Sequence, residues 1–359
     1  MKKKTENNGV FHVGLVFAVS LAVGVILLAA FLHLVGFRQI IVTIQSVDIR
    51  LVFLAFLLDM TGLVLYGACW YVLLRSAGLK IRFLSCISIA LAGIFTCYIT
   101  PSGFFMDASR VLLASKESDI SIGDGAATVI LHKIIFILGF VTYGLLAMAM
   151  LFASYGLSQA LAVNVLGLIA VVAAGIVGLT LIIVKGEKLR DVAPGLYEGI
   201  RSKLERICCK YLPKAVSSIG GVAKDFRSTF RKLVRNPMAM LVSYALALAY
   251  WATSVMILYV VFLALGYHVS IWAIMLTISI GDFIQMTPIA IPGMLGVLEV
   301  VTTTVLVMFG VPLSVAASAT LLGRIATFWF DIPVTGAAAS YYGVKYVASL
   351  AMSMSRPSK

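Results

Sequence analysis

The chain alternates long apolar runs with short polar interruptions, and several runs are long enough to cross a lipid bilayer. About 18 to 20 apolar residues in a helix span the hydrocarbon core. Two shorter apolar pieces, 83–100 and 271–287, each run up to a proline, which disfavours helical geometry in the residue before it. Runs of spanning length lie at about 12–37, 51–74, 123–152, 160–184, 238–265 and 313–343. The pattern predicts an all-α, polytopic helical membrane protein with about six full transmembrane helices.

Composition supports one integral membrane domain over residues 1–359. Hydrophobic residues make up 61% of the chain and charged residues only 12%, whereas soluble domains carry about 25% charged residues. The five cysteines have neither metal-ligand spacing nor a paired framework, and no nucleophile elbow or Walker loop occurs. We therefore expect no metal, no cofactor and no ATP-driven chemistry.

Basic residues predict the topology. Segment 185–237 contains 13 Lys/Arg and 5 Asp/Glu, and the positive-inside bias places it in the cytoplasm with the lysines of the N-terminus. Segment 185–237 and the N-terminus can both be cytoplasmic only if 83–122 enters the membrane from the cytoplasm and returns to it. The same argument for the C-terminal basic residues requires 271–311 to enter from the outside and return there. We thus expect two re-entrant helical hairpins and cytoplasmic N- and C-termini in a prokaryotic cytoplasmic membrane.

The two interruptions also repeat one another. Pro292 follows Pro101 by 191 residues, and Arg324 follows Lys133 by the same interval. The predicted topology orients the two repeats, about 51–152 and 238–343, in opposite directions. Inverted repeats of this kind build transporter sites at the repeat interface, near the bilayer midplane.

Ionisable residues inside apolar segments are costly and are therefore functional candidates. Asp107 and Arg110, three residues apart, share a helical face and could pair with each other. Alternatively, the forked donors of Arg110 could bind a phosphate, beside backbone N–H groups exposed by the turn at Pro101 and Gly103. The intramembrane set is Asp59, His132, Lys133, Asp282, Glu299, Arg324 and Asp331.

The second hairpin offers a glycine-rich turn and an acid. Pro292, Gly293 and Gly296 permit tight turning and close backbone approach. Glu299 follows just inside the next short helix, where it could complement the helix dipole or pair with Arg324 or with Lys133 across the repeat interface. A paired network is favoured because an unpaired buried carboxylate is strongly penalised. Lys133 and Arg324 together would form a positive centre between the halves.

The basic segment contains two amphipathic stretches, within 196–211 and 224–235. Such helices lie in the membrane interface and attract anionic headgroups, but the same charge could simply enforce topology. We expect no nucleic-acid partner, because membrane spans flank this charge on both sides.

Both hairpins resemble motifs in the transmembrane region of lysylphosphatidylglycerol synthases and the wider flippase-like family that shares it. The chain has Phe105-Met106 where relatives often have glycines, and Met294 replaces one glycine of the second motif. The first motif is matched by Pro101, Ser102, Gly103, Asp107 and Arg110. The second is matched by Pro292, Gly293, Leu295, Gly296, Val297 and Glu299, followed by Leu321, Leu322 and Arg324.

The resemblance implies a membrane module that moves or holds lipids. Full synthases carry a soluble aminoacyl transferase domain, whereas this chain ends about 16 residues after its last predicted helix, so we expect no such enzymatic activity. The expected ligand is an anionic phospholipid or polyprenyl-phosphate headgroup. The alternatives are a non-transporting partner that scaffolds or presents lipid to a lipid-modifying glycosyl- or aminoacyl-transferase, and an ion-coupled transporter of a small anion. A homo-oligomer is compatible with all three.

Overall fold

The computed structural model describes residues 2–45, 47–100, 103–155, 219–285 and 291–354, and every regular element in these ranges is a helix. The first half contains α1 (Lys2–Val35), α2 (Phe37–Gln45), α3 (Ile49–Ser76), α4 (Phe83–Ile99), α5 (Gly103–Ser118) and α6 (Ile122–Tyr155). The second half contains α9 (Ile219–Val234), α10 (Pro237–Ala264), α11 (Ile271–Gln285), a 3₁₀ turn (Pro292–Met294), α12 (Val297–Met308), α13 (Leu313–Arg324), a π-helical turn (Ile325–Trp329) and α14 (Phe330–Met354).

The predicted class, a polytopic all-helical membrane protein, is confirmed. Among the described residues five stretches are long and apolar enough to span a membrane: Ala18–Val35, Ile49–Ser76, Ile122–Ser154, Pro237–Ala264 and Leu313–Tyr346. Four begin within two residues of their predicted starts, and the fifth lies inside the predicted first span. The remaining predicted span, 160–184, lies outside the described residues, as does the first amphipathic stretch.

Local sequence signals explain where the long helices start. The Asp48 carboxylate accepts a hydrogen bond from the Arg50 backbone N–H at 2.9 Å, which caps α3. At the start of α10, the Asn236 side chain caps the Ala239 N–H at 3.1 Å, and Pro237 occupies the first helical turn. Proline suits that position because its missing N–H has no helical partner there.

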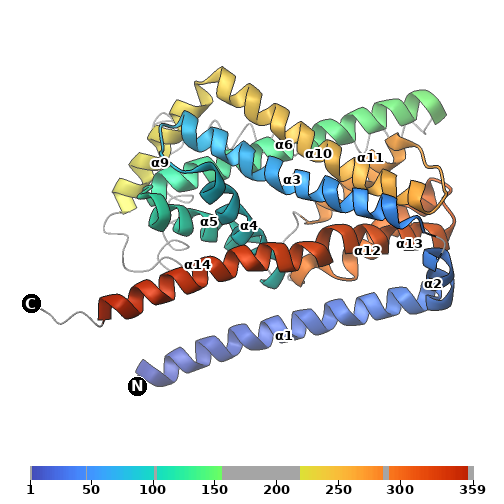
Figure 1. The fold of residues 1–359 in the computed structure, drawn as a ribbon, viewed down its shortest axis with the longest axis horizontal. Coiled ribbons are helices and arrows are strands. Elements are labelled where there is room, and N and C mark those ends of the chain that lie inside the picture. Colours follow the sequence, from blue (N-terminus) through green and yellow to red (C-terminus); the bar gives the residue numbers. More distant parts are fainter. Residues whose placement is uncertain (1, 46, 101–102, 156–218, 286–290, 355–359) are drawn as a thin grey trace, which may run out of the picture.

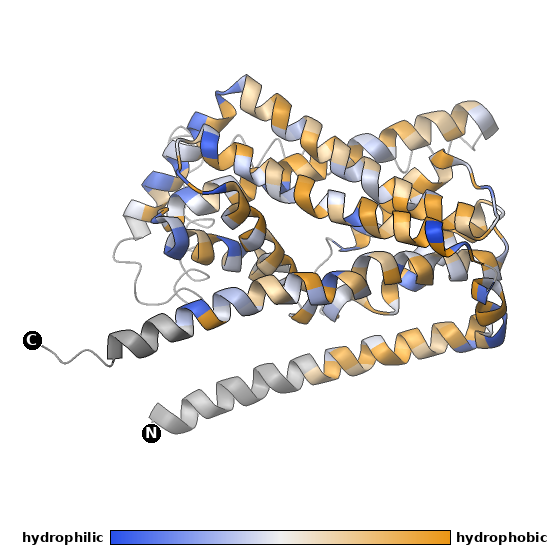
Figure 2. Cartoon of the chain, in the orientation of Figure 1, coloured by the Kyte–Doolittle hydropathy of each residue, from blue (hydrophilic) through white to orange (hydrophobic). Residues whose placement is uncertain are grey.

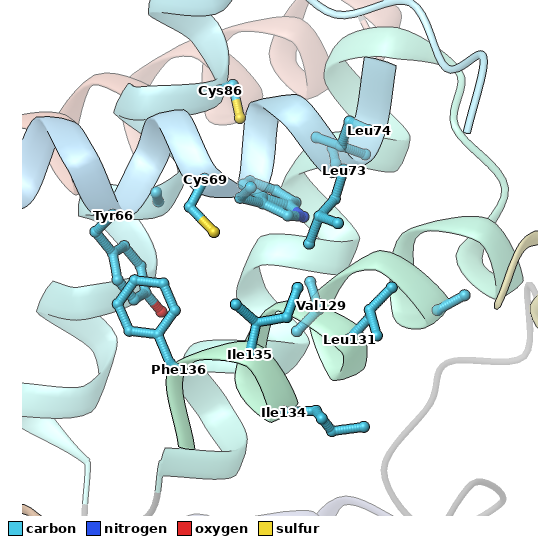
Figure 3. Close-up of a cluster of buried hydrophobic side chains, with 14 of the residues drawn as sticks. Tyr66, Cys69, Leu73, Leu74, Cys86, Val129, Leu131, Ile134, Ile135 and Phe136 are labelled. Atoms are coloured by element: carbon cyan, nitrogen blue, oxygen red, sulfur yellow. The ribbon is translucent and has the colours of Figure 1, made fainter. Parts of the chain in front are cut away.

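The long helices α3 and α10 pack along each other in the centre of the molecule (Figure 1). Gly62 of α3 allows this approach, since an added Cβ would lie 2.9 Å from Thr253 Oγ1. Figure 3 shows side chains of α3, α4 and α6 meeting in a buried cluster, in which the rings of Tyr66 and Phe136 are 5.0 Å apart. This packed centre also contacts the short helices, with α4 against α3 and α5 against α6.

The first short helix of each half packs against a long helix of the other half. Helix α4 packs on α14, where a Cβ on Gly336 would lie 3.1 Å from the Phe95 ring. Helix α11 packs on α6, where a Cβ on Gly144 would lie 3.3 Å from Ser279. The packing is therefore reciprocal: α4 and α11 are each the first short helix of their half, and each contacts the last long helix of the other half.

The two short pairs lie toward opposite ends of the molecule. In Figure 1, α4 and α5 lie toward the end where both chain termini are, whereas α11 and α12 lie toward the other end, near α2. Figure 2 shows hydrophobic residues dominating the middle of the long helices and hydrophilic residues gathered toward their ends. This distribution matches a bilayer running across the long axis of the molecule.

The second amphipathic stretch forms α9, whose apolar face packs against protein. Phe230 and Leu233 are fully buried, and α9 lies against α6. The Thr229 hydroxyl donates to the Asp124 carboxylate at 2.5 Å, and Lys232 Nζ donates to the Ala77 carbonyl at 2.6 Å. Helix α9 therefore closes one end of the bundle, so its apolar face is covered by protein rather than lipid.

The first helix covers the glycine-rich turn of the second half. A Cβ on Gly296 would collide with Leu27 and the backbone of Leu28, and one on Gly24 would lie 3.0 Å from Ile291. Gly296 also has φ +78°, in the left-handed region that side chains other than glycine rarely occupy. Close contact with α1 and backbone conformation therefore both require glycine here.

We expect Gly296→Ala to lower the free energy of unfolding more than Gly310→Ala does. Gly310 has a similar φ of +81° with nothing within 4 Å of an added Cβ, so its substitution costs only backbone strain, about 1–2 kcal/mol. Gly296→Ala adds the clash with α1, roughly 1–3 kcal/mol more. Denaturant titration in detergent micelles measures both, and equal losses would show that α1 does not pack on this turn.

Candidate functional site

The first polar group surrounds Arg110 of α5. This side chain is only 1% exposed, and its Nη1 donates to the Tyr66 hydroxyl at 3.0 Å. The guanidinium carbon lies 4.3 Å from the centre of the Trp70 ring, where a cation is attracted by the π electrons. Gly93 leaves room for the stem, because a Cβ there would lie 2.7 Å from Arg110 Cγ.

His132 of α6 completes the surroundings of Arg110. Its Nδ1 lies 3.5 Å from both terminal guanidinium nitrogens, and its Nε2 lies 3.1 Å from the Tyr66 carbonyl oxygen. A guanidinium can only donate, so Nδ1 accepts and the ring proton belongs on Nε2, which donates to the carbonyl. Neutral groups thus make the hydrogen bonds of the buried Arg110 cation, and its Nε has no hydrogen-bond partner among the described residues.

Asp107 lies one turn before Arg110 and pairs mainly with Lys133. Lys133 Nζ lies 2.6 Å from Asp107 Oδ2, whereas Arg110 Nη1 lies 3.9 Å from Oδ1. The Lys133 side chain is 47% exposed, so this pair borders the surface while Arg110 lies behind it. The Asp107–Arg110 pair anticipated from their spacing exists, but it is the longer of the two.

The second polar group joins Glu299 of α12 to Arg324 at the end of α13. Arg324 Nε donates to Glu299 Oε1 at 2.9 Å, and its Nη2 donates to the Gly293 carbonyl at 2.6 Å. The guanidinium carbon also lies 4.3 Å from the centre of the Phe328 ring. Arg324 therefore connects the carboxylate, the glycine-rich turn and the following π-helical segment.

The glycine-rich turn adopts a rare backbone conformation. Gly293, Met294 and Gly296 have φ values of +57°, +52° and +78°, and a Cβ on Gly293 would collide with the Phe328 ring. Met294 stands at a left-handed position that usually costs a residue with a side chain about 1–2 kcal/mol. Such strain persists where surrounding contacts impose it, and it gathers at functional sites.

The two groups have the same design. In each half, an acid on the second short helix pairs with a cation on the membrane-spanning stretch that follows: Asp107 with Lys133, and Glu299 with Arg324. Glu299 lies in the first turn of α12, as expected from the sequence. Of the two partners anticipated for Glu299, the described contacts give Arg324, and each cation is neutralised within its own half.

The remaining predicted residues lie near the ends of the short helices or outside the described residues. Pro101 and Ser102 lie outside the described residues, and Gly103 begins α5. Pro292 starts the 3₁₀ turn. Asp282 accepts a hydrogen bond from Gln285 Nε2 at 3.0 Å. Within the described ranges no cluster of three or more His, Cys, Asp or Glu could hold a metal ion.

A third buried polar group brings together residues that the sequence could not pair. The Tyr98 hydroxyl of α4 donates to Asp331 Oδ2 of α14 at 2.7 Å, and the carboxyl of Asp59 from α3 neighbours that of Asp331. Asp59 Oδ2 and Asp331 Oδ1 are buried, and within the described ranges neither atom has a hydrogen-bond partner outside this pair of acids. Both acids stand out in the sequence as charges inside apolar segments. Tyr98, Tyr66 and Trp70 do not stand out, because aromatic residues are ordinary packing residues of membrane helices.

Comparison with known proteins gives one family. The sequence model described as "Lysylphosphatidylglycerol synthase TM region" matches residues 16–334. A UPF0104 membrane protein of Pyrococcus horikoshii is 26% identical over 324 residues, covering 88% of this chain and 93% of the relative. One from Methanothermobacter thermautotrophicus is 23% identical over 328 residues, covering 91% and 95%. One from Archaeoglobus fulgidus is 26% identical over 294 residues, covering 80% and 85%.

We expect Arg324→Met to lower the free energy of unfolding by about 3–5 kcal/mol, because it leaves the buried Glu299 carboxylate unpaired. Lys133→Met should lower the free energy of unfolding by roughly half of that amount or less, since Arg110 remains 3.9 Å from Asp107. Denaturant titration in micelles measures both. The double variant Glu299→Leu/Arg324→Met should regain most of the loss, and a double variant as unstable as Arg324→Met would contradict the ion-pair explanation.

We expect Tyr98→Phe to lower the free energy of unfolding by about 1–3 kcal/mol, because the buried Asp331 Oδ2 then loses the hydroxyl that donates to it. Tyr259→Phe is the matched control. Its side chain is also partly buried, and its hydroxyl makes no hydrogen bond to a described residue. Equal stability of the two variants in thermal unfolding would show that the Tyr98 hydrogen bond is not needed.

Proposed function

Because the chain belongs to the lysylphosphatidylglycerol synthase transmembrane-region family, we propose that it binds or translocates a lipid carrying an anionic headgroup. The ligand class is a phospholipid or polyprenyl phosphate, entering between the two halves. The observation that carries the proposal is the twin arrangement of a carboxylate and a cation, Asp107–Lys133 and Glu299–Arg324, inside a chain otherwise made of apolar helices.

The chemistry of the first pair suits a phosphate. Lys133 is half exposed, so a phosphate oxygen could replace the Asp107 carboxylate at the ammonium, while Asp107 keeps Arg110 at 3.9 Å as a second cation. Arg110 lies behind this pair, and its buried Nε has no partner within the part of the chain that the structure describes. An arginine side chain can bind phosphate through two parallel hydrogen bonds. A headgroup that moves past Lys133 would therefore reach a second cation that can bind its phosphate with two hydrogen bonds.

In the second half, Arg324 performs the equivalent role. Its side chain is 14% exposed, and its Nη2 donates to the backbone carbonyl of Gly293 at 2.6 Å. Pro101, Ser102 and Gly103, which precede Arg110 in the sequence, are proposed as headgroup-binding residues of the first half. The π-helical turn that follows Arg324 supports a functional role, since such turns occur frequently at functional sites.

An inverted repeat with two re-entrant hairpins would place these groups between the halves. Three observations support it: the same order of long, short, short and long helices in each half, the reciprocal packing of α4 on α14 and of α11 on α6, and the opposite ends at which the short pairs lie. Movement of one hairpin at a time would expose the headgroup to one leaflet and then to the other. The proposed location is the cell membrane, with both termini in the cytoplasm.

A vesicle assay tests this function. The full chain is reconstituted with fluorescent phosphatidylglycerol, and the rate at which label becomes accessible to a membrane-impermeant quencher is measured. We expect Lys133→Gln and Arg110→Lys each to slow translocation by about tenfold, because each weakens one charge-assisted contact with phosphate. Lys224→Gln, an exposed position on α9, is the matched control and should keep the wild-type rate.

Two results would reject the proposal. One is a wild-type rate no faster than that of protein-free vesicles for phosphatidylglycerol and for a polyprenyl phosphate alike. The other is a Lys133→Gln or Arg110→Lys variant that folds normally and translocates at the wild-type rate, which would remove the site from the mechanism.

A further inference from the structure

A separate basic cavity lies at the end of the bundle closed by α9. Its volume is about 550 Å³, and it is lined by the end of α3, the loop before α4 and the end of α5. The lining residues are Arg75, Lys80, Ile81, Arg82, Ser85, Glu117 and Ser118. None of these belongs to the ion pairs described above, so the cavity is a distinct feature of the fold.

The charges of this cavity are unbalanced. Arg75, Lys80 and Arg82 are exposed and make no ion pair with any described residue. Glu117 is already engaged from outside the cavity, because its Oε2 lies 2.6 Å from Lys345 Nζ and accepts a hydrogen bond from Tyr346. Three cations therefore face the cavity, and the single carboxylate is already paired with a fourth.

The surroundings suit a lipid rather than a fully soluble ligand. Directly after Arg82, Phe83 and Leu84 are 41% and 74% exposed on the outside of α4, at the rim where cations and apolar side chains meet. Ser85 and Ser118 add hydroxyl donors. A phosphate in the cavity would leave acyl chains free to lie along this apolar surface of α4.

We propose that this cavity is a second site that binds the phosphate of an anionic phospholipid headgroup from one leaflet. The positive-inside bias predicts that leaflet to be the cytoplasmic one, and basic pockets between helices on that side are suited to lipid phosphates. The cavity lies beside α4 and α5, so a lipid bound here is held next to the first hairpin. The site is independent of the headgroup path proposed above and does not require translocation.

The test uses the full chain in phosphatidylcholine nanodiscs containing a minor fraction of phosphatidylglycerol, with retained lipid counted by native mass spectrometry. We expect wild type to retain phosphatidylglycerol in preference to phosphatidylcholine. Arg75→Gln/Arg82→Gln should weaken retention by about tenfold, since each basic residue near a membrane surface contributes severalfold. Lys224→Gln/Arg235→Gln removes the same charge from exposed positions on and just after α9 and should retain phosphatidylglycerol as wild type does.

Ser118→Asp is a second test variant, which leaves all the basic residues of the cavity in place. It adds a carboxylate to the lining, so it too should lower retention, and circular dichroism reports whether each variant keeps its helices. Phosphatidylglycerol retention by Arg75→Gln/Arg82→Gln equal to that of the α9 control overturns the proposal. Equal retention by Ser118→Asp and wild type does so as well.

A separate arm identifies the source of the phosphate. Inorganic phosphate is titrated into wild type, and retained phosphatidylglycerol should stay bound, because the acyl chains contribute to binding. Displacement by inorganic phosphate at concentrations comparable to those of the lipid would overturn the lipid assignment in favour of a soluble anion. Retention is measured without any translocation step, so failure of this site and failure of the proposed transport give different results.

Discussion

The cost of placing charge among apolar helices is the constraint on which this structure depends. An isolated ion there loses the hydration that water gives it, and only close partners restore part of that energy. Glu299 and Asp107 each lie within 3 Å of a cation, and Arg110 lies against an aromatic ring, a hydroxyl and an imidazole. The helices must therefore meet at specific registers, because a shift of one turn would separate these groups.

Close helix packing makes those registers possible. Glycines stand where two helices approach most closely, as at Gly62 between α3 and α10 and at Gly93 beside the Arg110 stem. Small residues of this kind let membrane helices come together where apolar burial alone cannot drive association. The same device recurs at Gly144 and Gly336, where each half receives the short helix of the other. Packing and charge placement thus depend on each other.

The two ion pairs differ in a way that bears on the proposed function. Glu299–Arg324 is nearly buried and is anchored to a strained turn, whereas Asp107–Lys133 reaches the surface. In the proposed function a ligand would therefore compete for Lys133 in this conformation, whereas reaching Arg110 or Arg324 would require the surrounding helices to separate. A lipid path through this protein would then involve at least two conformations, with the surface pair acting first.

The sequence by itself determined the class of the protein, the described long helices and the family. Hydrophobic run length is a local property, and proline and glycine mark interruptions without reference to the rest of the chain. It also singled out Asp107, Lys133, Glu299 and Arg324, because charge is rare in apolar segments. Only the tertiary structure decided which of these side chains contact each other. Lys133 pairs with Asp107, and Arg324 pairs with Glu299 and the Gly293 carbonyl. Asp331 accepts a hydrogen bond from Tyr98. These partners come from different helices, and pairwise distances between helices depend on packing of the whole bundle, which no local pattern encodes.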